Sequence, residues 1–175
     1  MSSGNHDPFR LGFLTAVEDA ERGMVGGLLV TNHFGRPLEF QCTTPLQPNR
    51  TQRILYGPTL RPYVLVEVIG RTLVEKVGVK PHVVLIEASE LLELRQFVAV
   101  PVASLSIPGE STPPSPEGLP VGKQWLRFHP NFAEDVALIR PRLTQVPDSA
   151  DLLEPFDRIR EALTETLKMP TARSA

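Results

Sequence analysis

Apolar residues in the first part of the chain fall into three short runs separated by polar turn residues. The runs are Leu11–Val17, Gly26–Thr31 and Leu38–Thr43. In the third run apolar and polar residues alternate, which is typical of a strand with one buried face. The connections between the runs contain glycine, which suits hairpin turns. The pattern predicts a three-stranded antiparallel meander at the start of a sheet.

After the third run, the spacing of the apolar residues becomes that of a helix. Residues 50–56 form a first short helical segment, and residues 59–77 carry apolar side chains at three- and four-residue intervals. Gly57 and Pro58 separate the two segments, because proline disfavours helical geometry in the residue before it. A break of this kind at Tyr56–Thr59 either lines a binding site or makes a simple corner between helices.

The remainder of the chain adds strands and helices in alternation. The predicted segments are a strand at 83–86, a short helix at 90–95, strands at 97–105 and 124–129, and helices at 131–139 and 151–168. The first of these strands is continuously apolar, as expected of a central strand covered on both faces. The sequence therefore predicts a mixed α/β (α+β) fold with an N-terminal meander, a long helix, further strands and C-terminal helices covering the sheet.

Composition divides the chain into five segments. They are a disordered N-terminus at 1–10, an α/β core at 11–105, a proline-rich linker at 106–122, a strand with C-terminal helices at 123–168, and a free tail at 169–175. The linker is predicted because its prolines and glycines favour extended chain over packed structure.

The overall composition narrows the class of protein. A chain of 175 residues with 41% hydrophobic content can bury a core without disulfides or a structural metal. The single cysteine, Cys42, cannot form an internal disulfide, and the four histidines are too scattered to predict a metal site. The net charge of −2 creates no global field that attracts nucleic acid. Without a secretory pattern or an apolar run of about 18 residues, we expect a soluble, cytoplasmic protein.

Three local features accompany this order of elements. They are the pair Gly26 and Gly27 at the start of the second strand, Glu67 within the long helix, and Glu87 directly after the apolar strand at 83–86. With them, residues 11–105 resemble the ribonuclease H-like fold.

The resemblance implies a metal-dependent, nuclease-like enzyme. In that family acidic residues in the first strand, the first helix and after the fourth strand hold two Mg²⁺ or Mn²⁺ ions that activate water on a phosphodiester. Carried onto this chain, the catalytic candidates are Glu18 or Asp19, Glu67 and Glu87, with nucleic acid as the partner. The chain departs from the family pattern inside the first strand, where Thr15 and its neighbours are not acidic.

The same acidic residues also have a purely structural interpretation. Glu67 lies four residues before Arg71, so the two are predicted to form an ion pair on the surface of the helix. Glu18 would then lie in a loop, and Glu87 would simply end a strand. The interpretation needs no cofactor and no metal.

Two groups of residues are candidates for binding. Arg36, Arg50 and Arg53, with Arg61 nearby, form a cationic cluster in the sequence that could hold a phosphate or an acidic partner. Trp125 and Phe156 belong to the C-terminal region, whose amphipathic last helix either docks in the groove of a partner or folds back on the sheet.

Without a cofactor motif, we expect a non-catalytic binding or assembly protein that acts with a partner protein or as a homo-oligomer. The metal-dependent nuclease-like enzyme is the alternative. The histidine at the hairpin tip, His33, lies beside Phe34 and is a further possible contact point, although a loop histidine is more often simply exposed.

Overall fold

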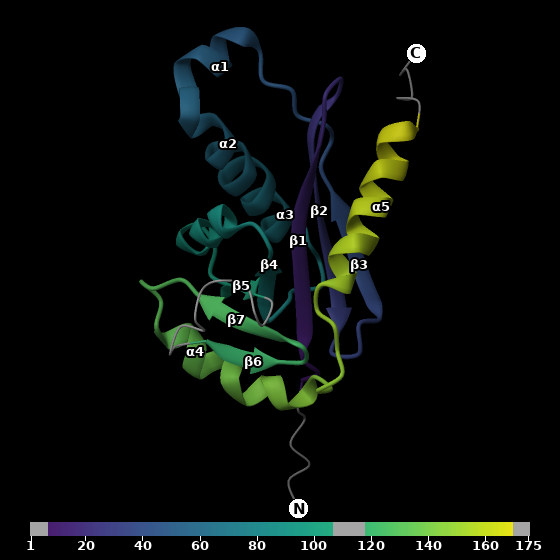
Figure 1. The fold of residues 1–175 in the computed structure, drawn as a ribbon, viewed down its shortest axis with the longest axis vertical. Coiled ribbons are helices and arrows are strands. Elements are labelled where there is room, and N and C mark those ends of the chain that lie inside the picture. The colour runs from purple at the N-terminus through teal and green to yellow at the C-terminus, as the bar shows by residue number, and fades with distance from the viewer. Residues whose placement is uncertain (1–6, 107–117, 170–175) are drawn as a thin grey trace, which may run out of the picture.

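A computed structural model describes residues 7–106 and 118–169 of the chain (Figure 1). Within these ranges seven strands form one sheet in the order β3-β2-β1-β4-β5-β7-β6. Their bounds are β1 Arg10–Asp19, β2 Gly23–Asn32, β3 Pro37–Cys42, β4 Val83–Ile86, β5 Val102–Ser106, β6 Leu119–Val121 and β7 Gln124–Phe128. β4 pairs in parallel with both β1 and β5, and the other pairs are antiparallel. The predicted meander and mixed α/β fold are confirmed.

The helices lie in three parts of the chain. The first series runs from Arg50 to Lys76, one helix lies between β4 and β5, and the others follow β7. The bounds are α1 Arg50–Tyr56, η1 Gly57–Thr59, α2 Leu60–Pro62, the π-helical η2 Tyr63–Gly70, α3 Arg71–Lys76, the 3-10 helix η3 Ser89–Gln96, α4 Glu134–Ile139, η4 Arg140–Gln145 and α5 Glu154–Lys168.

The break predicted between two helices lies at Gly57. Its φ of 52° is in the left-handed region, which glycine adopts without strain. On the other side of α1, Asn49 caps the helix by accepting a hydrogen bond from the backbone amide of Gln52, whose side chain accepts one from the amide of Asn49. α1 therefore has defined ends, and it projects from the body of the molecule (Figure 1).

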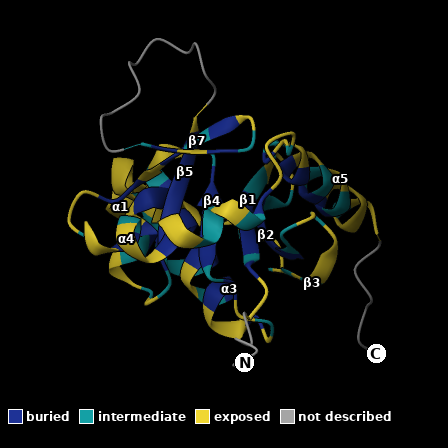
Figure 2. Ribbon diagram, turned by 90° about the horizontal axis from the view of Figure 1, so that it is seen from below, coloured by how far each residue is buried: buried dark blue, intermediate teal, exposed yellow. Residues whose placement is uncertain are grey.

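The sheet separates two hydrophobic cores. Because side chains alternate along a strand, Leu11 and Phe13 of β1 point to one face and Leu14 points to the other. α5 covers the first face, and η2, α3 and η3 cover the second. Figure 2 shows β2, β4 and β5 as largely buried, whereas the edge strand β3 is largely exposed. We call these two faces of the sheet the α5 face and the η2 face.

Gly26 and Gly27 allow helices on both faces to approach β2 closely. A Cβ atom on Gly26 would lie 2.1 Å from Cγ2 of Ile69 in η2, and one on Gly27 would lie 2.9 Å from Cγ2 of Ile159 in α5. The absence of side chains at these two positions therefore permits close packing on both faces of β2.

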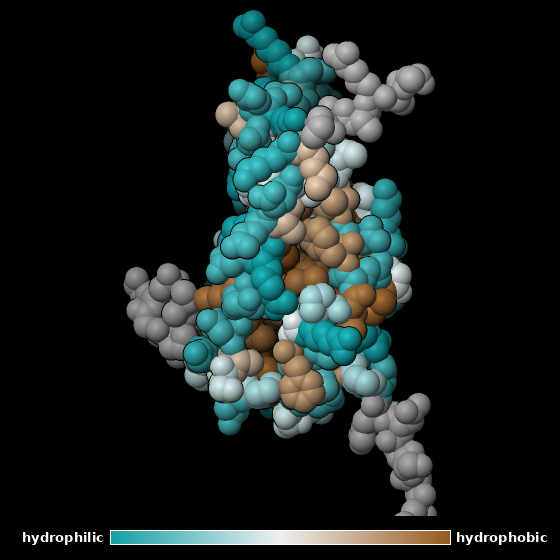
Figure 3. All heavy atoms as spheres, turned by 90° about the vertical axis from the view of Figure 1, so that its right-hand side faces the viewer, coloured by the Kyte–Doolittle hydropathy of each residue, from teal (hydrophilic) through white to brown (hydrophobic). Residues whose placement is uncertain are grey.

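The C-terminal helix folds back on its own sheet. Phe156 is fully buried and its ring contacts the Phe13 ring edge-on, with centroids 5.5 Å apart. The outer surface of the α5 side carries a band of hydrophilic residues beside an apolar area (Figure 3). Of the two alternatives for the last helix, the structure shows the second, because the apolar stripe of α5 is buried against the sheet.

Several predicted boundaries differ from the structure. The strand expected at 97–105 begins only at Val102, and the helix expected from 151 begins at Glu154. The predicted linker at 106–122 lies mostly outside the described residues, but its end forms β6. In the described part of the chain no helix is both long and apolar enough to cross a membrane.

Candidate functional site

Of the three acidic candidates, Glu18 and Glu67 lie on the η2 side of the sheet and Glu87 lies on the other side. Glu18, at the end of β1, accepts a hydrogen bond from Arg61 of α2 at 3.0 Å. Glu67 is in η2 and lines a hollow that Glu93 of η3 and Phe97 also border. Glu87 follows β4 and is ion-paired with Arg160 of α5, on the opposite face. The structure does not bring the three carboxylates together. Asp19, the alternative to Glu18, accepts hydrogen bonds from the backbone amides of its own turn.

The strand pattern explains this separation. Leu14 of β1 lies opposite Ile86 of β4 in a parallel pair, so the next residues, Thr15 and Glu87, point together to the α5 face. The residue beside Glu87 is thus a threonine rather than an acid. Glu18 lies three positions beyond Thr15 and therefore points to the η2 face.

These residues do not fit a metal pair. Among residues 7–106 and 118–169, no group of three or more His, Cys, Asp or Glu side chains is arranged to hold a metal ion. Divalent ions such as Mg²⁺ require several converging oxygen ligands. In the described part of the chain, the acidic residues that the resemblance implies therefore form ion pairs or line a hollow instead of forming a ligand set.

Arg160 supplies the positive charge at Glu87. Burial raises the pKa of the Glu87 carboxyl above its ordinary value, while the neighbouring Arg160 guanidinium opposes that rise. Arg160 also donates a hydrogen bond to Asp157 at 2.9 Å. Sequence reasoning missed Arg160, because 73 residues separate it from Glu87 and no local spacing connects them.

Glu67 does not form the predicted pair with Arg71. Arg71 donates its hydrogen bond to Glu75 at 2.8 Å instead, so the arginine turns to the acid four residues later rather than four residues earlier. Glu67 shares its hollow of about 340 Å³ with Tyr63 and Phe97.

The arginines that form a cationic cluster in the sequence lie at separate positions in the structure. Arg50 and Arg53 lie on α1, where every residue from 49 to 59 is exposed. Arg36 lies beyond the far end of β2, whose ten residues span about 30 Å. Trp125, also a binding candidate, is half-buried in β7. Arg36 is thus separated from Arg50 and Arg53, whereas Arg61 lines the same groove as Arg53.

We call the segment from Asn49 to Tyr63 the arm. At its base, the rings of Tyr56 and Tyr63 stack with centroids 4.9 Å apart. Ile54 and Leu55 are 69% and 78% exposed, which is unusual for large apolar side chains. The arm therefore presents cationic, aromatic and aliphatic groups together.

A groove of about 230 Å³ separates the arm from the tip of the β1–β2 hairpin. Arg53 and Arg61 line it on the arm, and Glu18, Gly23 and Met24 line it on the hairpin. Arg61 is held by Glu18 and by Glu90 at 3.1 Å. Arg53 has no carboxylate partner among the described residues, and its Nε donates only to the carbonyl of Pro48.

Several solved structures with a similar arrangement are endonucleases V. Endonuclease V from Bacillus subtilis aligns at 10% identity with a TM-score of 0.48, covering 91% of this chain and 82% of that one. The catalytic domain of human endonuclease V aligns at 12% identity with a TM-score of 0.45, covering 94% and 86%. Endonuclease V (D234N) from Ciona intestinalis, solved with a DNA containing inosine, aligns at 11% with a TM-score of 0.43, covering 90% and 87%.

These likenesses have TM-scores below 0.5 and assign neither a family nor an activity to this chain. No protein-family model matches the chain, and no curated protein matches it. The compared structures carry the names of nucleases, and the expectation of a protein-binding role is corrected. The last helix, α5, packs on its own sheet.

Proposed function

We propose that this protein binds nucleic acid through the arm, with the phosphate backbone against Arg50 and Arg53 and bases against Tyr56. The observation that carries the proposal is the position of these three residues on α1, a short helix with no buried residue. Neither arginine has a carboxylate within ion-pair distance in the described part of the chain. Both guanidinium groups are therefore available to phosphates.

The local charge supports this assignment although the whole chain is slightly acidic. Residues 40–66 contain three arginines and no acidic residue, whereas the net charge of the chain is −2. Screening at physiological salt limits the reach of a charge to about 8 Å, so a local cluster acts largely independently of distant acids. Arginine also binds phosphate oxygens through two parallel hydrogen bonds.

Aromatic groups beside the arginines favour single-stranded nucleic acid. Bases stack on exposed aromatic rings, and each stacked base contributes about 1–3 kcal/mol. Tyr56 is 38% exposed and is held in place by its stack on Tyr63. A ring that is both exposed and fixed in orientation loses little entropy when a base stacks on it.

Carboxylates lie on both sides of the arm, so the proposal places the phosphate contacts on Arg50 and Arg53 alone. Glu18 lines the groove with Arg53 and is paired with Arg61, and Glu67 and Glu93 line the hollow that Tyr56 borders. The proposal contains no metal-dependent cleavage step, because the described acidic residues do not form the ligand set that such a step requires.

The test is fluorescence anisotropy with labelled single-stranded DNA and RNA of about 20 nucleotides, a length that exceeds typical single-strand sites. Arg50→Ala/Arg53→Ala removes two phosphate contacts and is expected to weaken binding roughly 10- to 30-fold at about 0.1 M salt. The matched control is Arg36→Ala/Arg140→Ala, which removes the same charge from exposed positions outside the arm.

Equal affinities of the arm and control variants would contradict the proposal. The same oligonucleotides incubated with Mg²⁺ or Mn²⁺ and separated on a gel test cleavage directly. We expect full-length oligonucleotide with either ion, and a metal-dependent product would contradict the assignment of the acidic residues to ion pairs.

A further inference from the structure

Between the base of the arm, η2 and the end of η3 lies a hollow that is lined by aromatic rings and carboxylates. Its volume of about 340 Å³ is within the range of pockets that hold small molecules. The residues that define it are Tyr56, Tyr63, Phe97, Glu67 and Glu93, and none of its lining residues in the described part of the chain is basic. We call it the acidic hollow.

The groups that line the acidic hollow are accessible to a ligand. Tyr56 and Phe97 are 38% and 40% exposed, and the side chain of Glu93 is 58% exposed. Tyr63 and Glu67 are half-buried, which leaves part of each at the surface. A small molecule in the hollow can therefore reach both the rings and the carboxylates.

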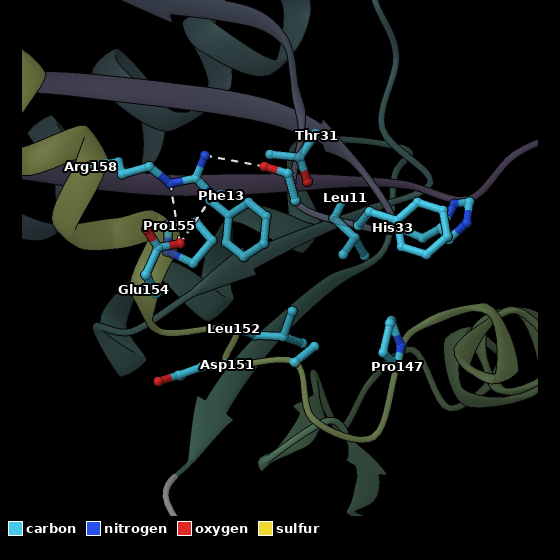
Figure 4. A pocket seen from close by; sticks show the side chains of 13 residues that line it. Leu11, Phe13, Thr31, His33, Pro147, Asp151, Leu152, Glu154, Pro155 and Arg158 are labelled. Atoms are coloured by element: carbon cyan, nitrogen blue, oxygen red, sulfur yellow. Dashed lines mark hydrogen bonds and ion pairs between the residues drawn. The ribbon is translucent and has the colours of Figure 1, made fainter.

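The cavity beside α5 presents much less side-chain surface (Figure 4). Leu11, Phe13 and Leu152 lie around it and are only 2%, 0% and 5% exposed. At its polar end Arg158 already donates a hydrogen bond to Glu154 at 3.2 Å. Of these two cavities, the acidic hollow is therefore the stronger candidate for a ligand site.

Glu67 brings to the hollow a negative charge that no side chain neutralises directly. It forms neither a hydrogen bond nor an ion pair in the described part of the chain. Arg71 attracts it only at longer range, because the hydrogen bond of Arg71 goes to Glu75 at 2.8 Å. The pKa of Tyr63 is raised, chiefly by a hydrogen bond with Tyr56 and further by the charge of Glu67, so the negative potential extends to the aromatic wall.

Glu93 adds a second carboxylate, one oxygen of which is free. Its Oε2 accepts a hydrogen bond from Gln96 and lies 3.5 Å from Nε2 of His129. Its Oε1 has no hydrogen-bond partner among residues 7–106 and 118–169. The two carboxylates together therefore favour a positively charged ligand over a neutral or negative one.

The aromatic rings decide which kind of cation fits. Aromatic rings attract cations to their faces, and quaternary ammonium groups are the ligands that such aromatic sites characteristically recognise. The methyl groups of such a cation also bury apolar surface against the rings. A bare metal ion instead needs several converging oxygens, and in the described part of the chain no group of three or more His, Cys, Asp or Glu side chains is arranged to provide them.

We propose that the acidic hollow binds a small organic cation of the alkylated ammonium class. Its methyl groups pack against Tyr56, Tyr63 and Phe97, and Glu67 and Glu93 balance its charge. Only Tyr56 also belongs to the proposed nucleic-acid site, and the cation is tested without nucleic acid. The two proposals can therefore fail separately.

The test uses choline and dimethylbutanol, the alcohol in which a carbon atom replaces the choline nitrogen. The two molecules have nearly the same shape, but only choline is charged. Each is titrated at constant ionic strength into ¹⁵N-labelled full-length protein, and backbone amide shifts are followed by NMR. We expect choline at millimolar concentration to shift the amides of Tyr63, Glu67 and Phe97, with an affinity about fivefold higher than that of the alcohol.

Two variants separate the contributions of charge and ring. Glu67→Gln/Glu93→Gln keeps the shape of the hollow and should weaken choline binding roughly threefold to tenfold without affecting the alcohol. Phe97→Leu removes one ring and should weaken choline binding about twofold to fivefold. The matched control Glu21→Gln/Glu161→Gln removes the same charge from exposed positions outside the hollow and should bind choline as the wild type does.

The proposal is overturned if choline shifts none of these amides at millimolar concentration. It is also overturned if choline and the alcohol bind the wild type equally well, or if Glu67→Gln/Glu93→Gln binds choline as tightly as its control.

Discussion

Glu87, directly after β4, is ion-paired with Arg160 of α5, although 73 residues separate them in the sequence. The pair lies at the carboxyl ends of the parallel strands β1 and β4, where the ribonuclease H-like resemblance implies a metal ligand. In this structure the positive charge beside Glu87 is the guanidinium group of Arg160. This contact also connects α5 to the carboxyl end of the central strand β4, beside Thr15 of β1.

Replacing Arg160 should destabilise the folded protein, because the half-buried carboxylate of Glu87 loses its ion-pair partner. Arg160→Met leaves Glu87 without its cation, so its pKa should rise further and the free energy of unfolding at pH 7 should fall by about 1 kcal/mol. Adding Glu87→Gln to this variant should recover most of the loss. Urea denaturation of the wild type, both single variants and the double variant measures the coupling, and strictly additive effects would contradict the pairing.

A more deeply buried pair should cost more to break. Arg95 of η3 donates hydrogen bonds to Asp135 of α4 at 2.7 and 3.1 Å, and the Asp135 side chain is 2% exposed. Asp135→Asn should lower the free energy of unfolding by about 3 kcal/mol, because Arg95 then stays buried without its counter-charge. The control Glu75→Gln breaks the exposed pair with Arg71 and should cost less than about 0.5 kcal/mol. Equal losses in urea denaturation would contradict the assignment.

Gly26→Ala should overpack the contact between β2 and η2. The new Cβ would lie 2.1 Å from Cγ2 of Ile69, so β2 or η2 must shift, at a cost of about 1–3 kcal/mol. Combining it with Ile69→Ala, which removes the clashing methyl group, should cost clearly less than the sum of the two single variants. Thermal unfolding of the four proteins measures the free energy of this coupling, and its absence would show that Gly26 tolerates a side chain.

Lowering the pH should destabilise the folded protein in two steps through the cluster of Asp7, Arg10 and His82. Burial lowers the pKa of His82 below 6.5, so the unfolded chain takes up this proton first and stability falls as the pH drops below 6.5. Hydrogen bonds from Arg10 and His82 lower the pKa of Asp7 from 3.8 to about 2. The contribution of Asp7 is complete above pH 3.8 and is lost as the pH falls through about 2.

Melting temperatures measured across this pH range separate the two groups. His82→Gln should flatten the slope just below pH 6.5, and Asp7→Asn should flatten it below pH 3.8. An unchanged profile in both variants would mean that neither group changes its proton affinity on folding.

The sequence predicts the local elements well and the site poorly, for physical reasons. The spacing of apolar residues predicts the β1–β3 meander and the helix over 59–77, because this spacing follows the buried face of each strand or helix. β6 was missed, since Pro120 and the surrounding glycines look like linker. The partner of Glu87 was missed because contacts between distant segments leave no trace in local spacing.

The arginine candidates show the same limit. Their proximity in sequence predicted one cluster with Arg36, but the hairpin carries Arg36 to the far end of β2, away from Arg50 and Arg53. Gly26 and Gly27 stand out in the sequence, but only the structure identifies their neighbours, Ile69 of η2 and Ile159 of α5.

The most direct test of the proposed nucleic-acid site is the salt dependence of binding to single-stranded DNA. The logarithm of the association constant should fall linearly with the logarithm of the salt concentration for the wild type. In Arg50→Ala/Arg53→Ala the slope should be smaller in magnitude by about 1.4, which corresponds to two lost phosphate contacts. Arg36→Ala/Arg140→Ala should keep the wild-type slope. The same slope in wild type and the arm variant would contradict the assignment of the arm as the nucleic-acid interface.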